Sequence, residues 1–285
     1  MQNVKKHSHL FFLAFFFIAN VFIWLAVFRE ERGNVLTVAF LDIGQGDAIF
    51  IEAPSGAQVL LDGGPNKRVL RELARMMPFY DRSIDAVIAS HPDKDHIGGL
   101  PAVLTRYDVG MAIDPGLPHD TAVYQEFERL IKEKNIERIR ARRGQIIWLD
   151  ESVYLEILFP DRDPKGWDTN DASIVARLVY GDISFMLTGD SPQKMEQYLV
   201  GLDGEALASD VLKLGHHGSK TSTSELFLGF VSPTYAIVSA GKDNQYGHPH
   251  KEVLELVERF GIPIFATYET GSIIIRTDGT NISID

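Results

Sequence analysis

The 285-residue sequence contains no cysteine, which excludes disulfide bonds, thiolate metal ligands and a cysteine nucleophile. Positive charge is also scarce: 28 Lys and Arg residues face 39 Asp and Glu residues, for a net charge of −11. Residues 1–28 hold two lysines and no acids, so the remainder carries 26 positive and 39 negative side chains, or −13. Such a surface does not favour tight nonspecific binding to nucleic acid, although a local patch can have the opposite sign.

Only one long hydrophobic run is present, from Leu10 to Phe28, interrupted by Asn20 alone. Its 19 residues suffice to cross a bilayer as a helix, so we predict a membrane anchor in residues 1–32 and a globular domain in residues 33–285. A cleavable signal peptide is the alternative, but its apolar core is usually shorter and ends at a cleavage site of small residues. Lys and Arg count two on each side of the run. The short N-terminal tail therefore decides for a single-pass protein of the cell membrane with an extracytoplasmic domain.

Beyond this run, strand-like and helix-like segments interleave. Alternating or β-rich composition predicts strands over 35–41, 48–52, 58–61, 85–90, 109–113, 154–159, 173–180, 183–187, 211–214, 235–239, 264–267 and 272–276. Helical patterns cover 69–77, 97–107, 121–134, 192–200 and 249–260. Strands interleaved with helices favour an α/β fold in which two packed sheets carry helices outside, an αββα sandwich.

The most informative segment is residues 91–96, His-Pro-Asp-Lys-Asp-His, which follows an apolar strand-like stretch. Four of its six residues can ligate a metal. A loop leaving a strand end can turn His91 and Asp93 toward one point and Asp95 and His96 toward an adjacent one. Two imidazoles and two carboxylates this close together are costly to place unless a cation lies among them.

Further candidate ligands also follow predicted strands: Asp190 after one, and His216 and His217 after another, while His248 precedes a predicted helix. Together with the two aspartates of residues 91–96, Asp190 brings three negative charges. The positive charge of two divalent cations slightly exceeds these three negative charges, and a bridging hydroxide restores the balance. Such a hydroxide forms at neutral pH because metal binding lowers the pKa of water from 15.7 to roughly 7. Two cations about 4 Å apart activate the nucleophile and stabilise charge on the substrate.

Six motifs in one order resemble the metallo-β-lactamase superfamily and, within it, the soluble domain of ComEC-type competence proteins. They are LDIGQGD at 41–47, LDGG at 61–64, HPDKDH at 91–96 followed by GG at 98–99, LTGD at 187–190, HHGS at 216–219 and YGHP at 246–249. The resemblance covers roughly residues 35–280. It implies a metal-dependent hydrolase of the metallo-β-lactamase-like fold.

The resemblance also implies two divalent metal ions, Zn²⁺ or Mn²⁺. Their implied ligands are His91, Asp93, Asp95, His96, Asp190 and His216. Asp93 stands where many members carry histidine, which favours Mn²⁺ beside Zn²⁺, and Asp190 matches the bridging carboxylate. Many members have a further ligand histidine between these two positions, whereas residues 169–173 contain none. The first metal is therefore expected to be weakly held, completed by water, or absent.

Other residues near these motifs receive supporting roles. We expect Asp95 and His248 to be catalytic, with His248 binding a phosphate or donating a proton, and Asp47 and Asp62 to orient metal ligands. Three residues are expected to contact substrate: Lys220, Ser219 and His217. Seven cations adjoin the motifs and could attract phosphate to one rim: Lys67, Arg68, Lys94, Lys213, Lys220, Lys242 and Lys251. The plainer alternatives are that the lysines are ordinary surface residues and that Asp190 and His248 merely cap helices.

By resemblance, the protein is a membrane-anchored phosphodiesterase or nuclease that cuts DNA during uptake through a metal-bound hydroxide. One span cannot form the channel that ComEC-type proteins carry, so a membrane channel partner is expected. A hydrolase of small molecules, such as a lactam or a phosphocholine ester, is the alternative that the acidic surface favours. A non-catalytic binding domain is a third, against which the full set of ligand motifs argues.

Overall fold

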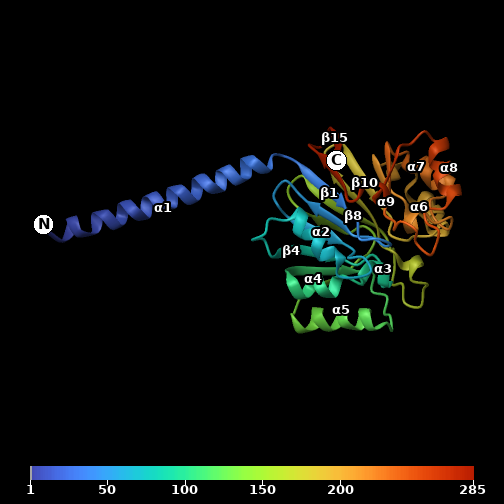
Figure 1. Ribbon diagram of the computed structural model, residues 1–285, viewed down its shortest axis with the longest axis horizontal. Coiled ribbons are helices and arrows are strands. Elements are labelled where there is room, and N and C mark those ends of the chain that lie inside the picture. Colours follow the sequence, from blue (N-terminus) through green and yellow to red (C-terminus); the bar gives the residue numbers. More distant parts are fainter. Residues whose placement is uncertain (1) are drawn as a thin grey trace.

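The computed structural model describes the backbone of residues 2–285 and the side chains of residues 9–25 and 33–285. Helix α1 (Gln2–Arg32) extends from the globular body as a long rod (Figure 1). Its large apolar side chains between Leu10 and Leu25 are exposed. Across the described residues, no helix has both the length and the hydropathy that crossing a membrane requires. The predicted apolar run continues to Phe28, and the side chains of its last three residues lie outside the described ones.

The globular body contains two mixed sheets. The first has the order β15-β14-β1-β2-β3-β4-β5-β6. Its strands are β1 (Leu36–Phe40), β2 (Ile49–Glu52), β3 (Gln58–Leu61), β4 (Ser83–Ile88), β5 (Asp108–Asp114), β6 (Glu137–Arg140), β14 (Ile273–Thr277) and β15 (Ile282–Ile284). The second has the order β13-β12-β11-β10-β9-β8-β7. Its strands are β7 (Ile146–Trp148), β8 (Val153–Phe159), β9 (Val175–Tyr180), β10 (Ile183–Leu187), β11 (Val211–Lys213), β12 (Tyr235–Val238) and β13 (Ile264–Ala266).

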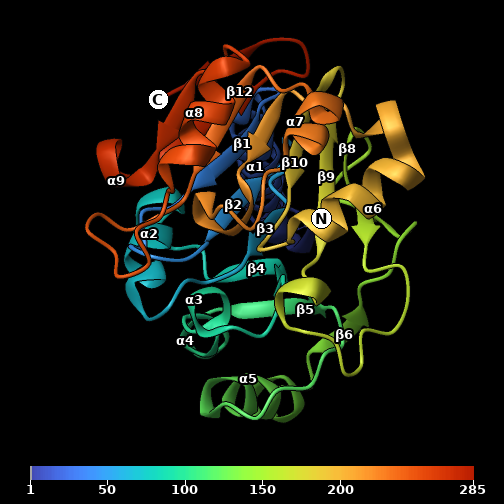
Figure 2. The same cartoon turned by 90° about the vertical axis from the view of Figure 1, so that its right-hand side faces the viewer.

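Helices cover the outer face of each sheet, as Figure 2 shows for α5 on one side and α7 and α8 on the other. The first sheet carries α2 (Arg68–Met76), α3 (Lys94–Ile97), α4 (Leu100–Arg106) and α5 (Ala122–Glu133). The second carries α6 (Gln193–Asp203), α7 (Glu225–Val231) and α8 (Lys251–Arg259), and α9 (Thr267–Thr270) follows β13. Short 3₁₀ turns are η1 (Asn170–Ala172), η2 (Gly204–Leu207) and η3 (Gly215–Gly218). The four layers confirm the predicted αββα arrangement.

The main core lies between the two sheets, where alternate strand residues point inward. Phe40, Ile49 and Phe185 are almost fully buried there. Burial of each such side chain stabilises the fold by roughly 1.5–3 kcal/mol. Two further apolar clusters join each sheet to its helices. Apolar residues thus fill the interior between the layers, and the polar groups discussed below lie at the strand ends.

Strand directions decide where α1 and the strand ends lie. β1 and β3 both pair with β2 in antiparallel fashion, so they run the same way, and β4 is parallel to β3. Since α1 leads into the start of β1, it lies at the end of the sheet where these three strands begin. The residues that follow β3 and β4 lie at the opposite end.

Several predicted elements differ in detail. The helix predicted over 97–107 is divided into α3 and α4 by Gly98 and Gly99, whose amides donate to Lys94 O and Gly64 O. A Cβ on Gly99 would lie 2.1 Å from Gly63 O, so this crossing of two chain segments requires glycine. The prediction missed β6, β7, β15, α7 and α9, which are short elements with little periodicity.

Candidate metal centre

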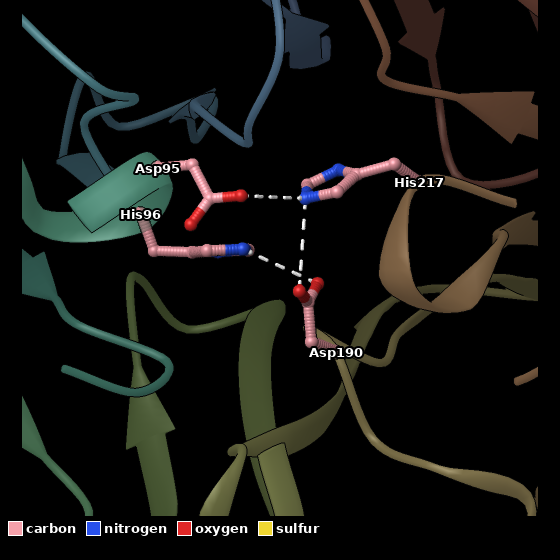
Figure 3. A group of neighbouring side chains, drawn as sticks. All are labelled: Asp95, His96, Asp190 and His217. Atoms are coloured by element: carbon pink, nitrogen blue, oxygen red, sulfur yellow. Dashed lines mark ion pairs between the residues drawn. The ribbon is translucent and has the colours of Figure 1, made fainter. Parts of the chain in front are cut away.

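The predicted metal-binding residues come from strand ends of both sheets. Asp62 follows β3, residues 91–96 follow β4, Asp190 follows β10 and His217 follows β11. The pairs β3–β4 and β10–β11 are each parallel, so each pair brings its polar residues to one edge. Figure 3 shows four of these side chains converging across the gap between the sheets.

The tightest group, here the first donor cluster, consists of Asp95, His96, Asp190 and His217, whose ligand atoms all lie within 4.8 Å of one another. His96 Nε2 lies 3.2 Å from Asp190 Oδ1, and His217 Nε2 lies 3.6 Å from Asp190 Oδ2. Asp95 Oδ2 is 3.4 Å from the same nitrogen of His217. Two carboxylates and two imidazoles in this arrangement suit a divalent cation such as Zn²⁺ or Mn²⁺.

The orientation of the imidazoles supports this assignment. His96 Nδ1 lies 2.7 Å from Asp62 Oδ2, and His217 Nδ1 lies 3.0 Å from Ser239 O. Their Nε2 atoms, like that of His91, are buried and have no hydrogen-bond partner. A neutral imidazole that donates from Nδ1 to an acceptor presents its Nε2 lone pair to a metal. The buried, unpartnered Nε2 atoms therefore fit metal ligation.

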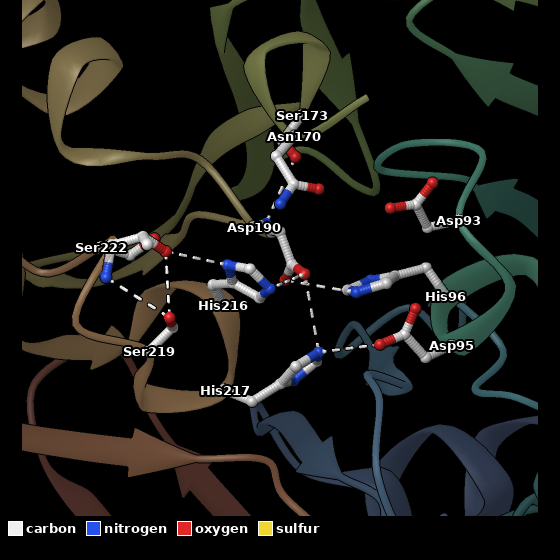
Figure 4. Close-up of polar contacts among 12 residues, drawn as sticks. Asp93, Asp95, His96, Asn170, Ser173, Asp190, His216, His217, Ser219 and Ser222 are labelled. Carbon is white, nitrogen blue, oxygen red and sulfur yellow. Dashed lines mark hydrogen bonds and ion pairs between the residues drawn. The ribbon is translucent and has the colours of Figure 1, made fainter. Parts of the chain in front are cut away.

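A second donor cluster, formed by His91, Asp93, Asp190 and His216, shares Asp190 with the first. His91 Nε2 is 3.6 Å from Asp93 Oδ2 and 3.9 Å from Asp190 Oδ2, and His216 Nε2 is 3.5 Å from Asp190 Oδ2. Figure 4 shows the Asp190 carboxylate between the imidazoles of both clusters. The shared carboxylate is the arrangement that a pair of adjacent cations requires.

The segment that lacks the expected histidine contributes oxygen atoms to this second cluster. Thr169 donates a hydrogen bond of 3.1 Å to Asp93 Oδ2. The neighbouring Asn170 lies beside Asp190, and its Oδ1 is buried without a donor (Figure 4). Neither residue was predicted, because a polar loop residue carries no periodic signal. The second cluster is thus more widely spaced and richer in oxygen than the first.

A comparison with protein families agrees with this geometry. The sequence model of the metallo-β-lactamase superfamily matches residues 41–242, which include all of the donors above. The chain belongs to the metallo-β-lactamase superfamily.

Curated relatives of this metallo-β-lactamase domain include competence proteins. ComE operon protein 3 of Bacillus subtilis is 33% identical over 260 residues, which are 84% of this chain and 33% of that protein. Competence protein ComA of Neisseria gonorrhoeae is 33% identical over 244 residues, which are 84% of this chain and 32% of that protein. The chain thus spans about a third of the length of these relatives. Among solved structures, the metallo-hydrolase Igni18 of Ignicoccus hospitalis matches with a TM-score of 0.55 and 15% identity, covering 84% of this chain and 98% of Igni18.

The paired histidines of the domain depart from the expected assignment. We expected His216 to be the final ligand, with His217 as the alternative ligand or as a substrate contact. His217 lies in the tighter first cluster and is 1% exposed, whereas the side chain of His216 is 26% exposed in the second. Both residues adopt left-handed backbone conformations, with φ of 49° and 56°. This turn, which costs energy for a residue with a side chain, directs two consecutive imidazoles toward Asp190.

Asp62 and Asp47, which we predicted to orient metal ligands, lie next to the imidazoles of the first donor cluster. Asp62 accepts hydrogen bonds from Ser90 N at 2.8 Å and Ser90 Oγ at 2.6 Å, in addition to its contact with His96. Asp47 Oδ1 is 3.3 Å from His217 Nδ1. Both carboxylates are fully buried, so they hold the imidazoles in fixed orientations.

Lys213 corrects one prediction. We had placed it among the cations of the rim, but it is fully buried, pairs with Asp47 and donates to Gly189 O at 3.2 Å. The signal was present, because Lys213 interrupts an apolar strand just before the two histidines. With this one lysine, the five carboxylates at the centre leave a charge of −4, which favours the binding of divalent cations. The five are Asp47, Asp62, Asp93, Asp95 and Asp190.

Two residues that we predicted to contact substrate, Ser219 and Lys220, differ in their exposure. Ser219 is buried and bonds Thr221 Oγ1 at 3.0 Å, and that hydroxyl lies 3.1 Å from His216 Nδ1. Ser219 therefore supports His216 through Thr221, while Lys220 is exposed. The ring of His248 lies 5.3 Å from that of His216. Asp190 and His248 do not cap helices, because the N-cap positions of α6 and α8 are occupied by Pro192 and His250.

Protons and metals are expected to compete at the first cluster. Burial lowers the pKa of His217, but Asp190 and Asp47 outweigh it and raise the pKa to about 9. Burial likewise opposes the charge on His96, but Asp190 and Asp62 raise its pKa well above the usual value. At pH 7 both imidazoles are therefore protonated without a metal, and metal binding must release these protons.

Metal affinity is accordingly expected to rise with pH up to about 9, where His217 loses its proton in the metal-free protein. Titration calorimetry with Zn²⁺ or Mn²⁺ at pH 7, repeated in buffers of different ionisation enthalpy, counts the released protons. We expect more than one proton for each cation bound at the first cluster. Binding without proton release at pH 7 contradicts this assignment.

Proposed function

We propose that this protein is a metal-dependent phosphodiesterase that cuts DNA. The observation that carries the proposal is Asp190, a buried carboxylate within 3.9 Å of imidazoles from two donor clusters. Paired cations stabilise both the attacking and the leaving oxygen in phosphoryl displacement. The competence proteins among the relatives support DNA as the substrate.

Divalent cations held by the residues of the two clusters would supply an activated water and polarise a phosphoryl oxygen. The chain's own residues hold that arrangement in place. Asp62 orients His96, and Ser239 O orients His217. Burial, and then the neighbouring His96, lower the pKa of His91 to about 3, so His91 is neutral at neutral pH. The ligands are thus fixed before substrate arrives, which is what a charged transition state requires.

His248 serves this reaction as a hydrogen-bond donor. Burial first, and then the neighbouring His216, lower the pKa of His248 to about 4. It is therefore neutral at pH 7. Its N–H can donate to a phosphate oxygen, which is the first of the two roles predicted for it. Asp95, with a 30% exposed side chain in the first cluster, remains open to the substrate.

A substrate panel tests the proposal against the small-molecule alternative, which the net charge of −11 favours. The purified protein is incubated with single-stranded DNA, bis-p-nitrophenyl phosphate, a chromogenic lactam and a phosphocholine ester. Each reaction contains Mn²⁺, Zn²⁺ or a chelator. We expect both phosphodiesters to be cut with metal and to survive with chelator. Turnover of the lactam or the phosphocholine ester alone decides for the alternative, and binding of metal without any turnover decides for a binding domain.

We further propose that α1 anchors the protein in the cell membrane with the domain outside the cytoplasm. Its exposed apolar side chains between Leu10 and Leu25 support this, since water solvates such a surface poorly. The metal centre lies at the sheet end remote from α1, which places it away from the bilayer. We expect the protein to remain in membranes after an alkaline wash and to be cleaved by protease added outside spheroplasts. Release by the wash contradicts the anchor, and co-purification of a channel protein supports the expected partner.

A further inference from the structure

A cavity of about 540 Å³ opens beside the first donor cluster. Its lining comes from the β1–β2 loop, the start of α2, α3 and the loop before α8, and includes Gln45, Arg68, Lys94, Asp95, Asn244 and Tyr246. Asp95 belongs to the first donor cluster. A molecule in this cavity therefore touches the metal centre directly.

The cavity presents two exposed cationic side chains. Lys94 is exposed and has no carboxylate partner in the described part of the chain. Arg68 pairs with Asp42 at 3.0 Å, and 39% of its side chain remains exposed. Exposed cationic donors next to a cation site favour an anionic ligand with several oxygens, such as a phosphate.

The rim of the same cavity carries an aromatic platform. The ring of Tyr246 stacks on that of His248 at 5.7 Å and 25°, and 55% of Tyr246 remains exposed. His248 in turn contacts His216 of the second donor cluster. One face of the tyrosine is thus covered and the rest is open. Aromatic rings lead from the metal centre to the rim of the cavity.

The loop that carries Tyr246 is held in place by Asn244. Its Oδ1 accepts from Tyr246 N and His248 N, each at 3.1 Å, and its Nδ2 donates to Gly241 O at 2.8 Å. These bonds fix the tyrosine relative to the centre before any ligand binds. A preorganised aromatic surface loses little entropy on binding.

We propose that this cavity binds the nucleotide next to the phosphodiester that is cut, in a single strand of nucleic acid. Lys94 and Arg68 contact its phosphate, and its base stacks on Tyr246. A base in a duplex is already stacked on both faces and paired, so it reaches Tyr246 only after the strands separate. The cavity therefore selects single strands. This inference rests on the proposed phosphodiesterase function and names its substrate.

Tyr246→Ala in the full-length protein tests the platform. We expect KM for single-stranded DNA to rise about fivefold or more, because base stacking on an aromatic side chain is worth at least about this factor. Hydrolysis of methyl p-nitrophenyl phosphate, which has no base to place, is expected to change much less in KM than cleavage of single-stranded DNA does. Tyr246→Phe is expected to restore KM. Tyr80→Ala removes a tyrosine that is 64% exposed but precedes β4, at the other end of the sheet, and serves as the matched control.

Binding separates this proposal from the proposed function. Fluorescence anisotropy with a phosphorothioate-linked oligothymidine measures occupancy of the cavity whether or not cleavage occurs. Weaker binding by Tyr246→Ala, with no change for Tyr80→Ala, supports the platform even if no substrate is cut. Equal binding by wild type and Tyr246→Ala, or tighter binding of a duplex than of a single strand, overturns it.

Discussion

Replacing Asp190 with asparagine is expected to lower phosphodiester hydrolysis about a thousandfold or more. Asparagine keeps the size of the side chain but removes the charge that lies 3.2 Å from His96 Nε2 and 3.5 Å from His216 Nε2. The substitution weakens both cation sites at once, and a metal ion contributes several kcal/mol of charge stabilisation in the transition state. Each 1.4 kcal/mol is a factor of ten in rate, which gives the expected size.

Initial rates with bis-p-nitrophenyl phosphate measure the loss, and elemental analysis of the same sample measures the metal content. Asp120→Asn removes a fully exposed carboxylate and is expected to change neither. Circular dichroism reports whether the variant folds. A folded Asp190→Asn protein with two bound metals and full activity would show that Asp190 does not link the two clusters.

Lys213→Met is expected to destabilise the fold by about 3–5 kcal/mol. Methionine is close to lysine in length but cannot pair with Asp47, which is fully buried. Burial raises the pKa of Asp47, but Lys213 and His217 outweigh it and lower the pKa to about 2. Removing one partner of a buried pair leaves the other charge uncompensated, and that costs several kcal/mol.

Urea unfolding in the presence of chelator measures this change without a contribution from bound metal. Asp47→Asn with Lys213→Met removes both charges and is expected to recover most of the lost free energy of unfolding. Lys220→Met replaces an exposed lysine and serves as the control. We expect it to change the free energy of unfolding by no more than about 0.5 kcal/mol. A double variant that is no more stable than Lys213→Met shows that the pair contributes little.

Much of the architecture could be predicted because it depends on local patterns. β1, β2 and the β9–β10 hairpin follow from short alternating or apolar runs with turn residues between them. Helix ends were less certain, since α3 begins at Lys94 and ends at a glycine pair that another chain segment requires. The short strands β6 and β7 pair through distant neighbours and have no periodicity of their own.

Some residues of the candidate site could likewise be predicted from the sequence, and others could not. Residues 91–96 and Asp190 could be identified from sequence because ligand types follow apolar strands, and a strand end places side chains at a sheet edge. The sequence could not decide which of His216 and His217 lies in the tighter cluster, because adjacent residues share the same local context. That choice depends on two left-handed φ angles and on the packing of Ser239 O against His217 Nδ1.

The sequence by itself determined which residues can bind cations, the strands that carry them, and the superfamily to which they belong. Tertiary structure alone decided that Asp190 lies between two clusters, that Lys213 is buried as a counter-charge, and that Asn170 stands beside the second cluster. The reason is physical. Local propensity acts within a few residues along the chain, whereas distances and burial arise when two sheets pack and bring together residues far apart in sequence.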